Sequence, residues 1–264
     1  MAEQAIPPQV PLPPRNPRLA WGLVVVLALA VLVLAGLVAV RDKEVADLRA
    51  KLPTGAVTPS TSETSPTGSA TPSSNAQAEE LMRSLPRRQE GDVRALGKVD
   101  APVVLIAWSD FRCPFCAHWA TTTFLELQPY LDSGSLRIEF RDLVLFGEQS
   151  RATAVASRAA GQQGKFWEYS QAVFVAAPTS GHATITRDDL LNFATESGVP
   201  DLEAFTTALD DQQLGAAVDE DTSQAQSIGL SGTPFFVINT TAISGSQPLE
   251  VFTKAIEGYG GKKA

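Results

Sequence analysis

Two cysteines stand three positions apart in the stretch WSDFRCPFCAHW, residues 108–119, and the chain contains no other cysteine. Two thiols at this spacing can form, break and exchange a disulfide when a helix begins at the first of them. At a helix start, unpaired backbone N–H groups and the helix dipole stabilise an anion. We therefore predict that Cys113 is a thiolate with a depressed pKa and that Cys116 lies one turn deeper.

The neighbours of the first cysteine favour the same chemistry. Pro114 suits a first helical turn because no N–H is needed from it there. We expect Cys113 to remain exposed to solvent and Arg112 to place a positive charge near its sulfur. A thiolate stabilised in this way is also a good leaving group, which makes the disulfide form an oxidant.

Three other roles for the cysteine pair stay open at this point. A structural disulfide between residues this close would enclose a very small loop and add little stability. Zinc could take Cys113, Cys116, His118 and His182, but C-x-x-C-x-H with one distant histidine matches no common zinc spacing, so we predict no metal. The third alternative is a peptide-binding module whose cysteines do no chemistry.

The elements that must hold the cysteines can be read from the sequence pattern. The apolar run VVLIAW, residues 103–108, predicts a strand buried on both faces immediately before them. A helix is expected from Cys116 to Tyr130, and SLRIEF, residues 135–140, alternates apolar and polar residues as a second strand would. Strand, helix and strand in this order indicate a βαβ unit.

The remainder of the chain continues this α/β pattern. Residues 149–229 are helical in pattern and predict four or five helices, one of them capped by Thr186 and Asp189. The runs SGTPFFVIN, residues 231–239, and TAIS, residues 241–244, predict two strands before a last helix. The fold class expected is therefore α/β, a thioredoxin fold with an inserted helical subdomain.

The start of the chain has a different composition. Residues 19–40 contain no charge, and a helix of about 22 residues reaches roughly 33 Å, which is enough to span a bilayer. We predict a transmembrane helix there, after a disordered tail at residues 1–18; a cleaved signal peptide is the alternative, but no small-residue cleavage pattern precedes Arg41. Residues 41–78 form a Ser/Thr/Pro-rich linker that cannot bury enough surface to fold, and residues 79–264 form the folded domain.

Composition limits the partners. The formal net charge is −8 and no cluster of lysine and arginine with interleaved aromatics occurs, so we predict that the protein does not bind nucleic acid. Basic residues flank the apolar helix on both sides, so the positive-inside rule does not decide its orientation. A reactive cysteine pair fits an oxidising compartment, which favours the extracytoplasmic side for the domain.

Several longer motifs agree in order with one known family. The stretches GDVRALGKVDAPVVLIAWSDFRCPFC, FRDLVLFG, SRATAVASRAAGQQGKFWEYSQAVF and SGTPFFVIN together resemble the DsbA-like thiol-disulfide oxidoreductases of the thioredoxin superfamily, in their membrane-anchored Gram-positive or actinobacterial form. The resemblance covers roughly residues 85–260. It implies that Cys113 is the exchanging nucleophile and that Cys116 is the resolving cysteine.

The same resemblance indicates where substrate would bind. Thr233 and Pro234 match the family's loop in which the proline is cis and the preceding backbone pairs with the substrate chain. Pro114 and Phe115, between the cysteines, complete the expected substrate-binding residues. This dipeptide lacks the histidine of the strongest bacterial oxidases, so a milder oxidant is expected.

Two positions depart from the family pattern. Relatives usually carry a buried carboxylate six residues before the first cysteine, which assists proton transfer, and this chain has Ala107 there. Glu139 on the neighbouring strand is a candidate substitute, although the pattern is also typical of an exposed strand residue. At residues 239–241 the sequence is NTT where relatives tend to have a glycine turn, so a distorted hairpin is expected.

The functional prediction is an enzyme of the cell membrane, single-pass, with its catalytic domain on the extracytoplasmic side. It would form disulfides in reduced or unfolded exported proteins, need no cofactor, and be reoxidised by a membrane partner of the VKOR or DsbB type, which the resemblance implies. An extracytoplasmic reductase or isomerase, or a peptide-binding or chaperone module without redox turnover, remains the alternative.

Overall fold

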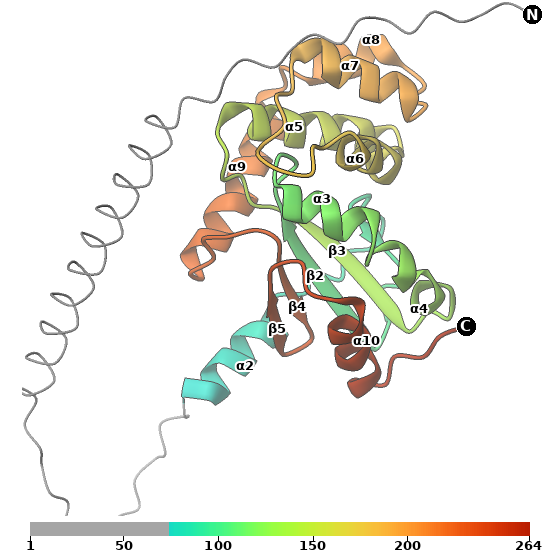
Figure 1. The fold of residues 1–264 in the computed structure, drawn as a ribbon, viewed down its shortest axis with the longest axis vertical. Coiled ribbons are helices and arrows are strands. Elements are labelled where there is room, and N and C mark those ends of the chain that lie inside the picture. The colour runs from blue at the N-terminus through green and yellow to red at the C-terminus, as the bar shows by residue number, and fades with distance from the viewer. Residues whose placement is uncertain (1–73) are drawn as a thin grey trace, which may run out of the picture. The chain divides into compact units, whose positions relative to one another are not determined.

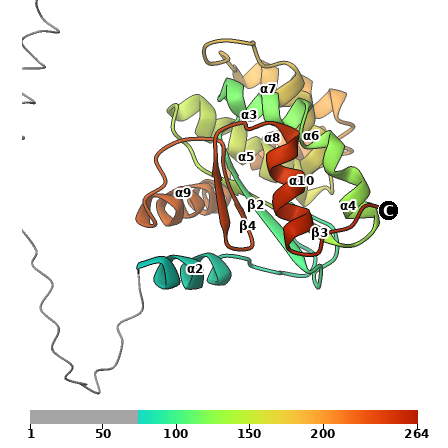
Figure 2. The ribbon, with the colours of Figure 1, turned by 60° about the horizontal axis from the view of Figure 1, so that its bottom comes forward.

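The computed structural model describes residues 74–264, which form a five-stranded sheet. Figures 1 and 2 show helices on both sides of this sheet. The sheet has the strand order β1-β3-β2-β4-β5. Strands β2 and β3 are parallel, and every other pair is antiparallel. The strands are β1 (Ala95–Leu96), β2 (Val103–Ser109), β3 (Leu136–Asp142), β4 (Phe235–Ile238) and β5 (Thr241–Ser244).

The two parallel strands lie at the positions that the sequence pattern predicts. All seven residues of β2 are buried, as a continuous apolar run requires in a central strand. Strand β3 alternates apolar and polar residues, but all seven of its residues are buried as well. Its polar face is therefore covered by protein and not by water.

Apolar residues divide the core between the two faces of the sheet. On one face, Leu105 and Ala107 of β2 and Ile138 of β3 belong to the same cluster as both cysteines. On the other face, Ile106 and Trp108 belong to a second, smaller cluster. Successive strand residues point to opposite faces, so this division follows directly from the sequence order.

The helix after the cysteines is shorter than the sequence pattern predicts. Helix α3 (Pro114–Thr121) ends with Thr122 as its C-cap, and the chain continues through the short η1 (Leu125–Leu127) to α4 (Gln128–Asp132). A run of three threonines explains the break, because β-branched residues have low helix propensity. The hydroxyls of Thr121 and Thr122 also bond to backbone carbonyls four residues earlier.

Five helices lie between β3 and β4, in the segment where the sequence predicts four or five, so the expected helical insertion is confirmed. Thr186 and Asp189 form the predicted capping box at the start of one of them. Figure 1 shows α5 and α6 beside α3, with α7 and α8 on the side away from the sheet. The five are α5 (Glu148–Gln162), α6 (Phe166–Val175), α7 (Arg187–Glu196), α8 (Leu202–Ala208) and α9 (Gln212–Ser227).

The hairpin near the end of the chain is regular, and the expected distortion at residues 239–241 is wrong. Strands β4 and β5 stay paired up to Ile238 and Thr241. Asn239 adopts a left-handed backbone with φ of 51°, which asparagine tolerates better than other non-glycine residues. Its side-chain oxygen accepts a hydrogen bond from the N–H of Val104, so the residue also fixes the turn to β2.

Two helices complete the described residues. Helix α10 (Leu249–Gly258) packs Phe252 and Ile256 into the cluster that contains the cysteines, and Figure 2 shows it across the sheet. Helix α2 (Ser74–Ser84) precedes the sheet. Within residues 74–264 no helix is both long and apolar enough to span a bilayer. The predicted tail at 1–18, transmembrane helix at 19–40 and nearly all of the linker at 41–78 lie outside the described residues.

Candidate active site

The nucleophile predicted from the sequence lies at the start of a helix. Cys113 is the N-cap residue of α3, with extended backbone angles, and Pro114 occupies the first turn. The carbonyl of Cys113 accepts the first helical hydrogen bond, from the N–H of Ala117 at 3.1 Å. The strand-to-helix turn therefore places the sulfur beside the unpaired N–H groups of the first helical turn, as expected.

A second loop, distant in sequence, meets the sulfur from the other side. The Thr233–Pro234 peptide bond is cis, as the family resemblance implies. The Cys113 thiol donates to the carbonyl oxygen of Thr233, with 3.3 Å between sulfur and oxygen. The structure thus brings the cis-proline loop to the first turn of α3, which carries Cys113, Pro114, Phe115 and Cys116.

Both cysteines are free thiols and both are buried, Cys113 with 2% and Cys116 with 1% of its surface accessible. The expectation that Cys113 is exposed is therefore wrong for this state of the molecule. The sulfur lies at the first turn of α3, between Cys116 and the carbonyl of Thr233, which cover it from the solvent. Phe115, by contrast, is 64% exposed, so the rim of the site faces water while its sulfur does not.

The two thiols differ strongly in acidity. A hydrogen bond from Cys116 is the main cause that lowers the pKa of Cys113 to about 6, helped by Thr233 and by the N–H groups of Cys116 and Phe115, against the effect of burial. Burial, followed by the neighbouring Cys113, raises the pKa of Cys116 well above its usual value. The predicted depression at Cys113 therefore has the second thiol as its largest source, with the helix N–H groups behind it.

Arg112 does not act on the thiol as expected. Its guanidinium donates to the carbonyl of Ala183 at 2.6 Å and to that of Phe146 at 2.5 Å. Both acceptors lie in loops beside the site. The residue therefore ties together segments around the cysteines and is not the cation that stabilises Cys113.

Glu139 is neither an exposed strand residue nor a substitute for the acid missing at Ala107. Its carboxylate is fully buried on the opposite face of the sheet from the cysteines, between Arg137 at 2.9 Å and Arg141 at 2.7 Å. The N–H groups of Arg87 and Arg88 also donate to it. These four donors lower its pKa overall, although burial alone would raise it.

The four residues of the zinc alternative are not gathered in one place. His118 lines a groove of about 610 Å³ between α3 and the loop before α10. His182 stacks on Phe146 with 3.8 Å between ring centroids, and its Nδ1 lies 3.1 Å from the carbonyl of Arg112. Among the described residues, no group of three or more His, Cys, Asp or Glu side chains is arranged to hold a metal ion.

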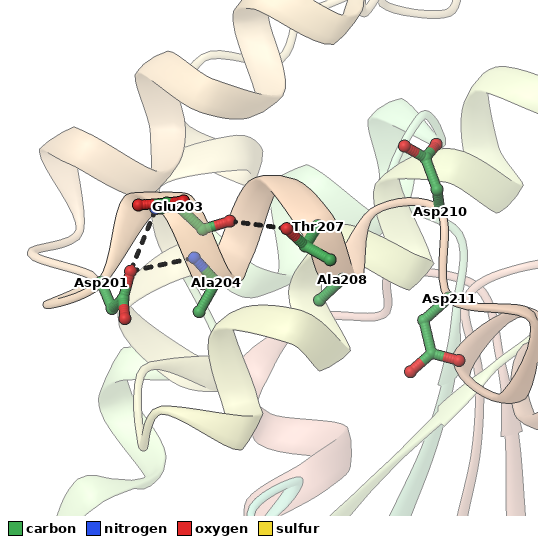
Figure 3. A pocket seen from close by; sticks show the side chains of 7 residues that line it. All are labelled: Asp201, Glu203, Ala204, Thr207, Ala208, Asp210 and Asp211. Atoms are coloured by element: carbon green, nitrogen blue, oxygen red, sulfur yellow. Dashed lines mark hydrogen bonds between the residues drawn. The ribbon is translucent and has the colours of Figure 1, made fainter.

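A second depression, of about 790 Å³, lies on α8 and is acidic, as Figure 3 shows. Asp201 there caps the helix by accepting from the N–H groups of Glu203 and Ala204. Asp210 pairs with Arg187. These carboxylates have structural roles, and the depression contains no thiol, so it is not the candidate site.

One residue near the thiols is not among the sequence-predicted site residues. Asp110 is buried at the end of β2, and its carboxylate accepts from the N–H of Arg112 at 2.8 Å. An aspartate that bonds to the N–H two residues later forms an Asx turn, a local pattern that a sequence can suggest. Its other contacts come from distant segments and could be found only in the fold.

A strand leads into a helix at a C-x-x-C pair beside a cis-proline loop, and one of the two thiols has a lowered pKa while the other has a raised pKa. These features together define a thioredoxin-fold dithiol protein. The arrangement can exchange a disulfide with another thiol, because only one of its two sulfurs ionises near neutral pH.

Comparison with known proteins agrees with this class. The thioredoxin family model matches residues 89–258. A probable disulfide bond formation protein D of Bacillus cereus is 30% identical over 151 residues, which is 55% of this chain and 69% of that protein. The chain therefore belongs to the thioredoxin family and is a DsbA-like thiol-disulfide oxidoreductase.

Solved structures share the fold, and the predicted thioredoxin fold class is confirmed. Oxidised BdbD of Bacillus subtilis superposes with a TM-score of 0.59 at 24% identity, covering 63% of this chain and 91% of that one. The α-DsbA1 protein of Wolbachia pipientis gives a TM-score of 0.57 at 23% identity, covering 69% and 96%.

Proposed function

We propose that this chain is a membrane-anchored oxidase that introduces disulfides into exported proteins through Cys113 and Cys116. The observation that carries the proposal is the geometry of the pair: Cys113 caps the start of α3 against the carbonyl of Thr233, and Cys116 is buried. This arrangement lowers the pKa of Cys113 to about 6 and raises that of Cys116. A stabilised thiolate favours the reduced dithiol, so the disulfide form gives its oxidising equivalents away readily. The name of the Bacillus cereus relative, a disulfide bond formation protein, supports the same direction.

The reaction follows from the two sulfurs. In the oxidised enzyme, a substrate thiolate attacks Sγ of Cys113, the Cys113–Cys116 bond breaks, and Cys116 leaves and takes up a proton. The second substrate thiolate then attacks the substrate sulfur of the mixed disulfide and displaces Cys113 as a thiolate. The substrate has lost two electrons and the enzyme has gained them. Thr233 and Pro234, with Pro114 and Phe115 at the rim, would hold the substrate chain during both steps.

A catalytic cycle then needs an oxidant. The proposal places the chain in the cell membrane through residues 19–40, with the domain on the extracytoplasmic side, because those residues carry no charge over a bilayer-spanning length. A quinone-linked membrane protein of the VKOR or DsbB type would restore the disulfide. The Ser/Thr/Pro-rich segment at residues 41–78, between residues 19–40 and the domain, would act as a tether.

The direction of electron flow is tested by the equilibrium potential of the Cys113–Cys116 pair in the full chain, measured against glutathione. We expect a value well above that of thioredoxin, which is about −270 mV. A value at or below that of thioredoxin would make the protein a reductase and overturn the proposal. Cys113→Ser is expected to abolish the oxidation of reduced ribonuclease A, and full retention of that activity would exclude the dithiol mechanism.

The location has its own test. The chain contains only these two cysteines, so a membrane-impermeant maleimide added to intact reduced cells reports their side of the membrane directly. Because Cys113 is 2% exposed, the labelling rate of the folded protein after cell lysis is the reference, and labelling at that rate without lysis is expected. Labelling only after lysis would place the domain in the cytoplasm.

A further inference from the structure

Asp110 joins three segments of the chain at one buried carboxylate. The residue is 2% exposed and stands three positions before Cys113. Each of its two oxygens accepts two hydrogen bonds. The donors are the N–H of Arg112 at 2.8 Å and the hydroxyl of Ser150 at 2.8 Å for Oδ1, and the N–H groups of Leu145 at 2.8 Å and Phe146 at 3.3 Å for Oδ2.

The backbone of the same residue contacts both cysteines. The carbonyl of Asp110 accepts from the N–H of Cys113 at 3.1 Å. A backbone hydrogen bond of Asp110 also acts on the Cys116 thiol and favours its ionised form. A shift of this one residue would therefore displace both sulfurs.

Arg112 holds the same turn from its outer side. Its guanidinium bonds to the carbonyls of Phe146 and Ala183, and its own carbonyl lies 3.1 Å from Nδ1 of His182. The loop after β3 and the loop after α6 thus fix the turn. Phe146 bonds to both residues of the turn, because its N–H donates to the carboxylate of Asp110 and its carbonyl accepts from the guanidinium of Arg112. The segment that carries the nucleophile has little freedom to move.

We propose that Asp110 is a positioning residue of the dithiol: its carboxylate holds the turn that presents Cys113 to the N–H groups of α3 and to the cis-proline loop. The inference rests on the proposed roles of Cys113 and Cys116. The physical reason is that hydrogen bonds to sulfur weaken steeply when distance or angle changes, so a small displacement of the turn costs the thiolate its donors.

A direct charge effect of the Asp110 carboxylate would change the pKa of Cys113 in the opposite direction. The sign of the measured change therefore tests the proposal. If the carboxylate mainly repelled the Cys113 thiolate, its removal would lower the pKa of Cys113. If it positions the turn, its removal raises that pKa. Asp110→Asn keeps the size of the side chain but replaces one acceptor oxygen with an NH₂ group, which would face two donors.

The experiment measures three properties of the full-length protein carrying Asp110→Asn: the pKa of Cys113 by thiolate absorbance, the equilibrium potential against glutathione, and the rate of disulfide exchange. We expect the pKa to rise by one unit or more, the potential to become more reducing, and kcat to fall about tenfold or more at pH 7. Ser150→Ala removes one of the four donors and should produce a smaller change in the same direction.

Asp221→Asn is the matched control. Asp221 is a buried aspartate of α9 that accepts from three arginines, Arg87, Arg94 and Arg158, so its replacement should destabilise the domain to a similar extent. It should leave the pKa of Cys113 at about 6. Equal shifts in both variants would reduce the role of Asp110 to general stability and overturn the proposal.

Two further outcomes separate this inference from the proposed function. A folded Asp110→Asn protein whose Cys113 pKa is unchanged or lower overturns the positioning role, even if the wild type is an oxidase. A wild type with a reducing potential overturns the oxidase assignment, while a raised Cys113 pKa in the variant would still support the positioning role.

Discussion

The sulfur of Cys113 lies 3.3 Å from the carbonyl oxygen of Thr233, a residue 120 positions later in the chain. The contact links the first turn of α3 to the loop that leads into β4, which pairs with β2 directly before the cysteines. The site therefore depends on the antiparallel pairing of two strands that are distant in sequence.

The acidity of Cys113 should depend on its partner thiol. Because a hydrogen bond from Cys116 is the main cause of the low pKa, Cys116→Ala should raise the pKa of Cys113 from about 6 toward the ordinary value of about 8.5. Cys116→Ser retains a hydroxyl donor and should give an intermediate value. Thiolate absorbance or the pH dependence of alkylation measures both, and an unchanged midpoint in the alanine variant would contradict the assignment.

The stability of the reduced protein should increase with pH relative to the oxidised protein. The pKa of Cys113 is lower in the folded state than in the unfolded chain, so its contribution is complete above about pH 8.5 and is lost as the pH falls through about 6. The difference in melting temperature between the reduced and oxidised forms should grow from pH 5 to pH 8. A difference that stays constant over this range would show that the folded-state pKa is not depressed.

Loss of Glu139 should destabilise the domain without changing its redox chemistry. Glu139→Ala leaves Arg137 and Arg141 buried without their shared carboxylate, which typically costs about 3–5 kcal/mol in the free energy of unfolding. Glu168→Gln, in an exposed pair with Lys165, is the control and should cost less than about 1 kcal/mol. Urea unfolding measures both, and the pKa of Cys113 should stay at about 6 because Glu139 lies on the other face of the sheet.

The same carboxylate should contribute to the acid sensitivity of the fold. The pKa of Glu139 lies below its usual 4.5 despite burial, because Arg137, Arg141 and two backbone N–H groups stabilise the charged form. Its contribution to stability is therefore complete above about pH 4.5 and is lost as the pH falls below that value. Glu139→Gln should remove part of the pH dependence of the free energy of unfolding between about pH 5 and pH 3. An unaltered pH dependence would show that other groups cause the acid sensitivity.

Phe115 should affect substrate binding more than stability. The side chain is 64% exposed between the two cysteines, so Phe115→Ala should change the free energy of unfolding by less than about 0.5 kcal/mol. We expect a higher KM for protein substrates with little change in kcat. Leu202→Ala, at an exposed apolar position on α8, is the control. An equal effect of the two variants on KM would show that Phe115 is not part of the substrate-binding surface.

The sequence alone determined the local features of this protein. The apolar run before the cysteines, the proline after the first of them and the alternation in β3 are short-range signals, and each specifies backbone conformation through periodicity or through a fixed φ angle. The capping box at Thr186 is of the same kind. Because these signals act within a few residues, the positions of β2, β3 and the start of α3 could be predicted, as could the nucleophile's place at a helix start.

Only the tertiary structure decided what surrounds each side chain. The alternating pattern of β3 fits a solvated face as well as a buried one. The carboxylate of Glu139 is bonded by Arg137 and Arg141 of its own strand and by the N–H groups of Arg87 and Arg88, about 50 positions earlier in the chain. Arg112 is adjacent to Cys113 in sequence, yet its guanidinium is directed to carbonyls 34 and 71 residues away. The same holds for the burial of Cys113 and for the three distant donors on Asp110, which are Leu145, Phe146 and Ser150. Burial and hydrogen-bond partners depend on long-range packing, and no pattern within one segment contains that information.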